Sequence, residues 1–473
     1  MTTSHTSMKR TLTRVAAVTL VTLSAACNAD KLNIRDFNRP TIDGVAKDPN
    51  GIQILATGLT DTERDQWFGM ISDFGIFGRE SYRYFATDAR SVSNYLIGIA
   101  GPKLDPAGFA SGNWGGRFQQ MRNVVKFNEA VDASTLLSAS EKRGAKGFAN
   151  TFYALNVMYL IISRDTLGTP VTITEDVTVP APFVTRDSAY KFVIGTLDAA
   201  AQDLAAGGAA FPFALHSGYT GFTTPSTFLR LNRALAARAN NYRGSLGCGA
   251  PCYNAALTAL QGTWVPALGS TVTQANLDVG VYHIFSAAAG DTPNTASFAQ
   301  DAQNYAHAST VTDAQARTGG VDARVERKVV ALAAPVPAPG GFGIAATHRF
   351  NVYPTITSNG PLVRAEELMM LRAEANIMTG NAAGALQDVN AVRTVSGGLP
   401  ALASLGATQA AQLDAMLYEK RMSLLFEGHR WHDLRRYNRL GTLPLDRTNH
   451  FVARVMPIPQ AECDGRATKP NGC

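Results

Sequence analysis

The sequence predicts an all-α protein in which helical hairpins stack side by side. Four long segments carry apolar residues at the spacing of one helix face, and they span residues 114–133, 141–164, 187–204 and 225–242. Near the C-terminus, a segment of strong helix formers over 364–378 is followed by a tight turn at Gly380 and a second, alanine-rich helix. Small residues allow paired helices to approach closely, so such hairpins can stack into an array.

Local signals mark where several of these elements begin and end. Thr185 is a suitable N-cap residue, and Pro225 suits the first turn of a helix. Gly380 suits a left-handed C-cap, so the hairpin that it closes resembles a tetratricopeptide-like repeat. Residues 263–350 are rich in Gly, Pro, Thr and Ala without a sustained period, which predicts a variable, loop-rich face beside the hairpins.

The composition is that of a folded protein without a strong charge bias. Apolar residues make up 45% of the 473 residues and charged residues only 17%. The formal net charge of +6 includes Lys9, Arg10 and Arg14, which precede the first acidic residue. Because no Lys- or Arg-rich run remains beyond them, we expect no nucleic-acid partner.

The N-terminus predicts export. The basic start is followed by an uncharged, mostly apolar stretch over 15–26, which is too short to span a bilayer but suits a signal peptide. Ser24-Ala25-Ala26-Cys27 resembles the lipobox of bacterial lipoproteins, in which the cysteine is acylated. The alternative is an ordinary signal peptide with a coincidental cysteine. We therefore expect a signal peptide over 1–26, lipid on Cys27, a polar tether over 27–50 and a single domain over 51–473.

The other four cysteines fall into two pairs that are close in sequence, Cys248 with Cys252 and Cys463 with Cys473. An even number of cysteines in close pairs suits disulfides in an oxidising compartment. Three connectivities are possible, and local pairing requires the least rearrangement of the chain. A zinc site is disfavoured because no second Cys or His pair lies near Cys252.

Motifs of the common catalytic sites are absent from the sequence. There is no G-x-S-x-G, P-loop, Rossmann or H-E-x-x-H pattern. His429 and His432 could share a metal, but the neighbouring Arg430, Arg435 and Arg436 would repel a cation. We therefore expect no catalytic residues, no metal and no cofactor.

The C-terminal region, about 360–473, resembles the SusD/RagB family. Residues 364–375 (RAEELMMLRAEA), 390–393 (NAVR), 419–436 (EKRMSLLFEGHRWHDLRR) and 457–462 (PIPQAE) are similar to family motifs in order and spacing. Weaker similarities lie upstream at residues 114–128, 167–170 and 322–324. Lys420 and Thr394 stand where the family usually has arginine, and residues 205–350 match little.

This resemblance implies a SusD-like fold and a non-catalytic, lipid-anchored protein at the surface of the outer membrane. Such a protein would bind an oligosaccharide or other oligomeric nutrient and deliver it to a SusC-like, TonB-dependent transporter. Two alternatives remain: a secreted glycan- or peptide-degrading enzyme, and a helical-repeat scaffold without a small-molecule site.

The signature motif itself suggests a structural role. Its acidic and basic residues crowd one predicted helix and its end, where pairs such as Glu427 with Arg430 can form. Glu427 and Asp433 lie on different sides of such a helix, which disfavours a glycosidase pair. The residues expected to tie the last helix to its neighbours are Glu419, Arg421, Glu427, Arg430, Trp431 and Asp433.

Ligand capture requires exposed aromatic rings beside polar groups. The segment from Trp67 to Tyr95 has this composition, and Tyr282 and Tyr305 form a second candidate region. The alternative for each ring is a place in the core. The predicted ligand-contacting residues are Trp67, Tyr82, Tyr84, Tyr95, Tyr282 and Tyr305.

Overall fold

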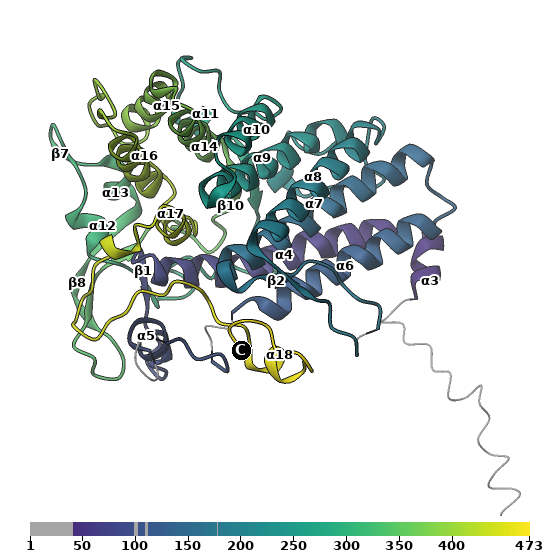
Figure 1. The fold of residues 1–473 in the computed structure, drawn as a ribbon, viewed down its shortest axis with the longest axis horizontal. Coiled ribbons are helices and arrows are strands. Elements are labelled where there is room, and N and C mark those ends of the chain that lie inside the picture. The colour runs from purple at the N-terminus through teal and green to yellow at the C-terminus, as the bar shows by residue number, and fades with distance from the viewer. Residues whose placement is uncertain (1–40, 99–102, 109–111, 177) are drawn as a thin grey trace, which may run out of the picture.

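A computed structural model describes residues 41–98, 103–108, 112–176 and 178–473 of the chain (Figure 1). Its long helices are α4 (Gly51–Phe77), α6 (Trp114–Ala133), α7 (Ala139–Arg164), α8 (Arg186–Ala205), α9 (Pro225–Arg243), α10 (Ala250–Gln261), α14 (Ala365–Met378), α15 (Ala382–Val395) and α16 (Gln409–Ser423). The shorter ones are α3 (Ile42–Lys47), α5 (Arg90–Val92), α11 (Gln274–Asp278), α12 (Ser309–Thr312), α13 (Ala323–Lys328), α17 (Arg430–Arg436) and α18 (Gln460–Asp464). The predicted all-α class is confirmed, with small strands added.

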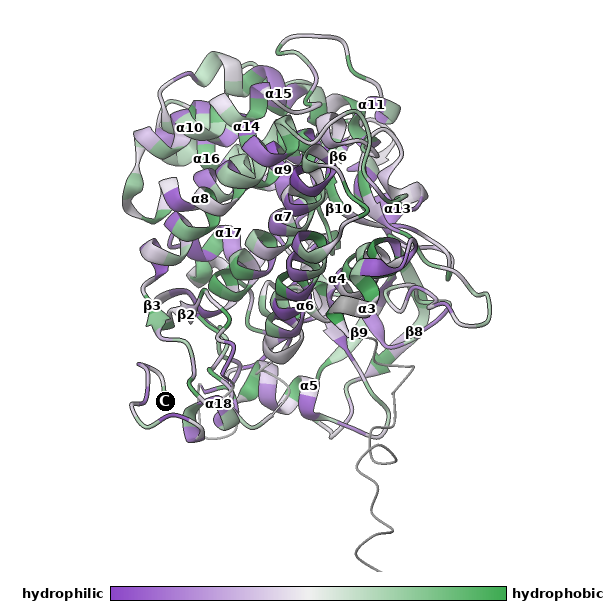
Figure 2. Ribbon diagram, turned by 90° about the vertical axis from the view of Figure 1, so that its right-hand side faces the viewer, coloured by the Kyte–Doolittle hydropathy of each residue, from purple (hydrophilic) through white to green (hydrophobic). Residues whose placement is uncertain are grey.

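The long helices pack as successive neighbours. α6, α7, α8, α9 and α10 each contact the next along the chain, and α14 contacts α9, α10, α15 and α16 (Figure 1). Thr185 caps α8 by accepting a hydrogen bond from the Ser188 N–H, and Pro225 lies in the first turn of α9, as predicted. Gly380 adopts the predicted positive φ, 85°, between α14 and α15. Figure 2 shows polar and apolar residues alternating along these helices, as in amphipathic elements.

The sequence predicted no strands, but the described chain contains a four-stranded sheet and three smaller strand pairs. β1 (Ser81–Arg83), β5 (Asn304–Ala306), β9 (Ala345–Phe350) and β8 (Val329–Pro337) form an antiparallel sheet in that order. Smaller pairs are β4 (Gly280–His283) with β10 (Gly360–Arg364), β2 (Thr169–Pro170) with β3 (Phe183–Val184), and β6 (Ala316–Arg317) with β7 (Gly320–Val321). Short 3₁₀ or π segments are η1 (Ser93–Ile97), η3 (Asp165–Leu167), η4 (Ser217–Tyr219), η5 (Gly244–Cys248) and η6 (Leu440–Thr442). The sheet is built mainly from the region predicted to be loop-rich.

The start of the described chain departs from the predicted tether. The signal peptide and Cys27 lie outside the described residues, but residues 42–47 form the helix α3 instead of an extended arm. The Thr41 hydroxyl caps this helix, and Val45 and Ala46 are buried where α3 contacts α4 and α6. The tether prediction is therefore wrong for this segment, because its few apolar residues suffice to dock it on the helical domain.

Candidate ligand-binding face and the buried signature network

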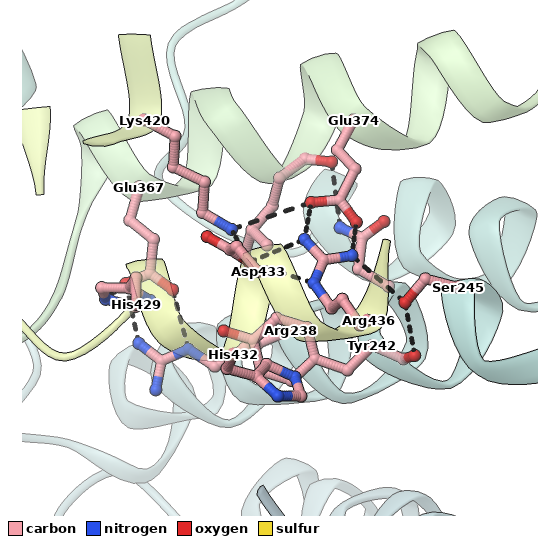
Figure 3. A network of polar contacts seen from close by, with 12 residues as sticks. Arg238, Tyr242, Ser245, Glu367, Glu374, Lys420, His429, His432, Asp433 and Arg436 are labelled. Atoms are coloured by element: carbon pink, nitrogen blue, oxygen red, sulfur yellow. Dashed lines mark hydrogen bonds and ion pairs between the residues drawn. The ribbon is translucent and has the colours of Figure 1, made fainter. Parts of the chain in front are cut away.

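The C-terminal signature forms a buried ionic network among four helices (Figure 3). The Arg436 guanidinium in α17 is fully buried and pairs with both carboxylate oxygens of Glu374 in α14. It also donates to Asp433 Oδ1 at 2.8 Å, and Lys420 Nζ in α16 donates to the same oxygen at 3.0 Å. Arg238 in α9 donates two hydrogen bonds of 2.7 Å to Glu367 in α14. The network therefore ties α9, α14, α16 and α17 together.

The charges of this network are matched. Burial alone would lower the pKa of Arg436, but Glu374, Tyr437 and Asp433 together outweigh burial and hold that pKa well above its ordinary value. Burial likewise opposes ionisation of Asp433, but Lys420 and Arg436 keep its pKa below the usual range. Bidentate arginine–carboxylate pairs of this kind fix geometry as well as charge. The geometry supports the structural role proposed for the signature.

Two predicted details of the signature are wrong. Residues 419–436 do not form one continuous helix, because α16 ends at Ser423 and the chain turns through Phe426 (φ 60°) and Gly428 (φ 85°) before α17. Glu427 consequently pairs with Arg364, at 2.8 Å, instead of Arg430. Glu419 is also held from outside the motif, by Arg393 at 2.7 Å and Arg324 at 2.6 Å.

Most of the predicted ligand-contacting rings lie inside the core, so that prediction is corrected. Trp67 is 3% exposed and its ring centroid lies 5.2 Å from that of Tyr353 and 5.7 Å from that of Phe285. Tyr82 and Tyr84 stack on each other 5.4 Å apart. The buried rings are Trp67, Tyr82, Tyr84, Tyr95 and Tyr305. They cannot stack on a ligand without unpacking the core, because helix and sheet neighbours cover their faces.

Tyr282 differs from the other predicted rings. It is half-buried in β4, and its hydroxyl donates to the carbonyl oxygen of Asp278. Burial raises the pKa of this phenol above its ordinary value. Because Tyr282 is only half-buried, its side chain stays partly accessible to solvent, although its hydroxyl already donates to Asp278.

Two half-buried arginine–aromatic clusters lie beside the loop from Phe298 to Tyr305. In the first, the Arg83 guanidinium carbon lies 4.8 Å from the Phe68 ring centroid and 4.4 Å from that of Phe85. In the second, the Arg349 guanidinium carbon lies 5.2 Å from the Phe298 centroid. The three rings Phe68, Phe85 and Phe298 are only partly covered.

The same loop links the two clusters. Asp301 pairs with Arg83 at 3.2 Å, and the Phe298 ring makes an edge contact with Tyr305, 5.6 Å between centroids. Tyr305 in turn pairs with Arg349 across β5 and β9. Phe68, Arg83 and Phe85 belong to the segment singled out in the sequence, but Phe298 and Arg349 could not be found from the sequence, because only the sheet pairing brings them near. We call Phe68, Arg83, Phe85, Phe298, Asp301 and Arg349 the arginine–aromatic face.

Disulfides join Cys248 to Cys252 and Cys463 to Cys473 in the structure. The second one closes the C-terminal segment after α18, where the Arg466 Nη2 donates to the Ala181 carbonyl oxygen at 2.9 Å. This disulfide therefore holds the end of the chain close to the loop between β2 and β3.

We expect replacement of Cys463 and Cys473 by serine to lower the free energy of unfolding by about 2–3 kcal/mol, because a short loop is no longer closed in the unfolded chain. Chemical denaturation of the purified protein with its disulfides intact measures this loss. Non-reducing peptide mapping is the direct check of the pairing, and free thiols or cross-linked pairs would contradict it.

Comparison with known proteins found one matching family model and several solved structures with a similar fold. The SusD family model matches residues 345–468. A SusD-like protein, P38, from Formosa agariphila is 32% identical over 116 residues, a segment that spans 23% of this chain and 23% of that protein's length. The surface glycan-binding protein A of Bacteroides uniformis superposes with a TM-score of 0.66 at 16% identity, covering 89% of this chain and 99% of that one.

Other solved structures have a similar fold. NanU of B. fragilis gives a TM-score of 0.65 at 15% identity, over 92% of this chain and 99% of that one. A laminarin-binding SusD-like protein gives 0.60 at 15% identity, over 90% and 100% of the two chains. The described chain therefore has a SusD-like fold, and residues 345–468 match the SusD family model. The segment that matches the family model runs from β9 through α18, and it contains Glu374, Lys420, Asp433 and Arg436 of the buried network.

The acidic side chains of the signature are occupied by ion pairs. Glu427 and Asp433 are both bound by cationic side chains, as described above. Within the described ranges, no cluster of three His, Cys, Asp or Glu side chains is placed to hold a metal ion. Of the helices in the described part of the chain, none combines the length and apolar character needed to cross a membrane.

Proposed function

We propose that this SusD-like protein binds oligosaccharides at the cell surface without cleaving them and delivers them to a SusC-like, TonB-dependent transporter. The observation that carries the proposal is the superposition of nearly the whole described fold on structures that include a surface glycan-binding protein and a laminarin-binding protein. The helical core provides a rigid support, and the arginine–aromatic face supplies the chemistry of recognition.

The arginine–aromatic face suits a sugar because its rings and charges alternate. Apolar faces of sugar rings stack on aromatic side chains, while guanidinium and carboxylate groups bind hydroxyls. Phe68 and Phe85 flank Arg83, which is 23% exposed, and Asp301 adds an acceptor that is 14% exposed. Several half-exposed rings along one surface suit an oligomer, since each ring can hold one residue of the chain.

The buried ion pairs support a binding role over hydrolysis. A glycosidase uses two carboxyl groups on either side of a glycosidic bond. The signature carboxylates Glu374, Glu427 and Asp433 are instead buried against arginine and lysine. They are therefore committed to holding the helices together.

We expect replacement of Arg83 by methionine or of Phe298 by alanine to weaken oligosaccharide binding at least tenfold, about 1.4 kcal/mol. Both side chains are partly exposed, so the thermal midpoint should fall little. Isothermal titration with a glycan selected on an array measures the affinity, and Arg143→Met in α7, at a pair with Asp203, serves as a matched control. Unchanged affinity in both face variants would move the site elsewhere, and a protein that binds no glycan would favour the helical-scaffold alternative.

We also propose that Cys27 carries the lipid anchor and that residues 28–40 link it to the domain. Mass spectrometry of the membrane fraction should find a diacylated or triacylated cysteine, and Cys27→Ser should release the protein into the soluble fraction. An unmodified thiol or cleavage at another residue would contradict the proposal. Pull-down from native membranes should recover a TonB-dependent channel with the wild type.

A further inference from the structure

A cavity lies against the C-terminal helices and borders the buried signature network at Lys420 and Asp433. It has a volume of about 200 Å³ and is formed by α16, α17, η6 and Glu80, the residue before β1. Asp414 and Thr442 at its mouth are exposed, while Glu80, Lys420 and Leu424 at its floor are each 1% exposed. One water molecule occupies about 30 Å³ of liquid, so the cavity has room for a molecule of several heavy atoms.

The floor of this cavity carries Arg430, a buried cation that forms no ion pair within the described residues although the Glu80 carboxylate lies near it. The Arg430 guanidinium is 9% exposed, and its one hydrogen bond to the described residues runs from Nη1 to the Arg79 carbonyl oxygen at 3.1 Å. No carboxylate of the described chain lies within ion-pairing distance of it. Burial and the neighbouring Arg421 lower the pKa of Arg430 to about 9, so it remains charged at neutral pH. A buried guanidinium is costly unless an anion accepts its hydrogen bonds, and neither carboxylate oxygen of Glu80 accepts one.

Other donors around Arg430 are also unused. Arg421 pairs with Asp313 at 2.6 Å, but its buried Nε has no acceptor. Arg439 pairs with Asp414 near the mouth, and its buried Nε likewise has no acceptor. The side chains of Leu417, Leu424 and Leu434 complete the wall with an apolar surface. Both Nε atoms are shielded from solvent, so the Arg430 guanidinium and the apolar wall are the features that suit an anion attached to a small ring.

We propose that this cavity binds an acidic sugar residue, whose carboxylate or sulfate group pairs with Arg430. The choice of a sugar rests on the proposed glycan-binding function, whereas the requirement for an anion rests on the unpaired arginine donors alone. Glu80 lies beside Arg430 and Arg421, so its charge opposes an incoming anion. Removing the charge of Arg430 should therefore weaken anion binding, and removing that of Glu80 should strengthen it. A purely structural role for the two residues would not change affinity in opposite directions.

The test titrates the purified chain with glucuronate, glucose 6-sulfate and glucose. We expect at least one acidic probe to bind and glucose not to bind. Arg430→Met should weaken that binding at least tenfold, Glu80→Gln should strengthen it several-fold, and Arg143→Met should leave it unchanged. Preference for glucuronate assigns a carboxylate, and preference for glucose 6-sulfate assigns a sulfate ester.

The outcomes separate the two proposals. Three results would overturn the acidic-sugar site. Neither acidic probe binds, or glucose binds as tightly as they do. The third is that Arg430→Met and Glu80→Gln shift the affinity in the same direction. If Arg430→Met does not fold, the Glu80→Gln variant tests the site by itself. Unchanged or weaker binding of the acidic probes by Glu80→Gln would then overturn the site. Acidic probes that bind while no oligosaccharide is captured at the arginine–aromatic face would retain the anion site and contradict the proposed function.

Discussion

Replacing Arg436 with methionine is expected to lower the free energy of unfolding by about 3–5 kcal/mol. The substitution leaves the fully buried carboxylate of Glu374 without its bidentate partner, and Lys420 Nζ, 3.7 Å away, would be its nearest remaining cation. An uncompensated charge in the core is far more costly than a lost surface pair. Urea denaturation of the wild type and the variant measures the difference.

A double variant distinguishes loss of the charge balance from loss of packing. In Arg436→Met/Glu374→Leu both charges are removed, so we expect much of the stability to return, because apolar side chains can replace a buried ion pair at little cost. Arg143→Met, at a largely exposed pair with Asp203, should cost at most about 1 kcal/mol. An Arg436→Met protein as stable as the wild type would show that the network does not hold the helices.

Replacing Trp67 with alanine is expected to destabilise the protein by about 3–5 kcal/mol, because the cavity left among His283, Phe285 and Tyr353 cannot collapse fully. The affinity of the folded fraction for oligosaccharide should stay within about twofold of the wild type, since the ring contacts no ligand. Thermal midpoint and affinity are measured together, with Phe298→Ala as the matched aromatic control. If Trp67→Ala loses affinity for the oligosaccharide while its thermal midpoint is unchanged, Trp67 would be a ligand-contacting residue after all.

The helices could be predicted where local signals are strong. Residues 114–133 form α6 as expected, and α9 begins at the predicted Pro225 because Thr224 caps it and the proline needs no helical N–H partner. Helix α4 was not among the predicted helices. Its buried residues face several directions, because it contacts α3, α6, α17 and β1 at once. A one-sided apolar stripe is therefore absent.

The site depends on contacts between distant parts of the chain. Trp67 is buried by residues of β4 and of the segment before β10, and nothing near it in sequence reveals this. Arg349 meets Phe298 because β5 and β9 pair in one register, which composition alone does not specify. The signature motif indicated the family, but Glu427 found its partner in Arg364 because the chain turns between α16 and α17.

Capture without cleavage is tested most directly by incubating the purified chain with an oligosaccharide that it binds and separating the sugars by chromatography. We expect a saturable complex from which the oligosaccharide is recovered at its original length, with binding weakened at least tenfold in Arg83→Met. Shorter products that disappear when a single carboxylate is replaced would contradict it and would identify the protein as an enzyme.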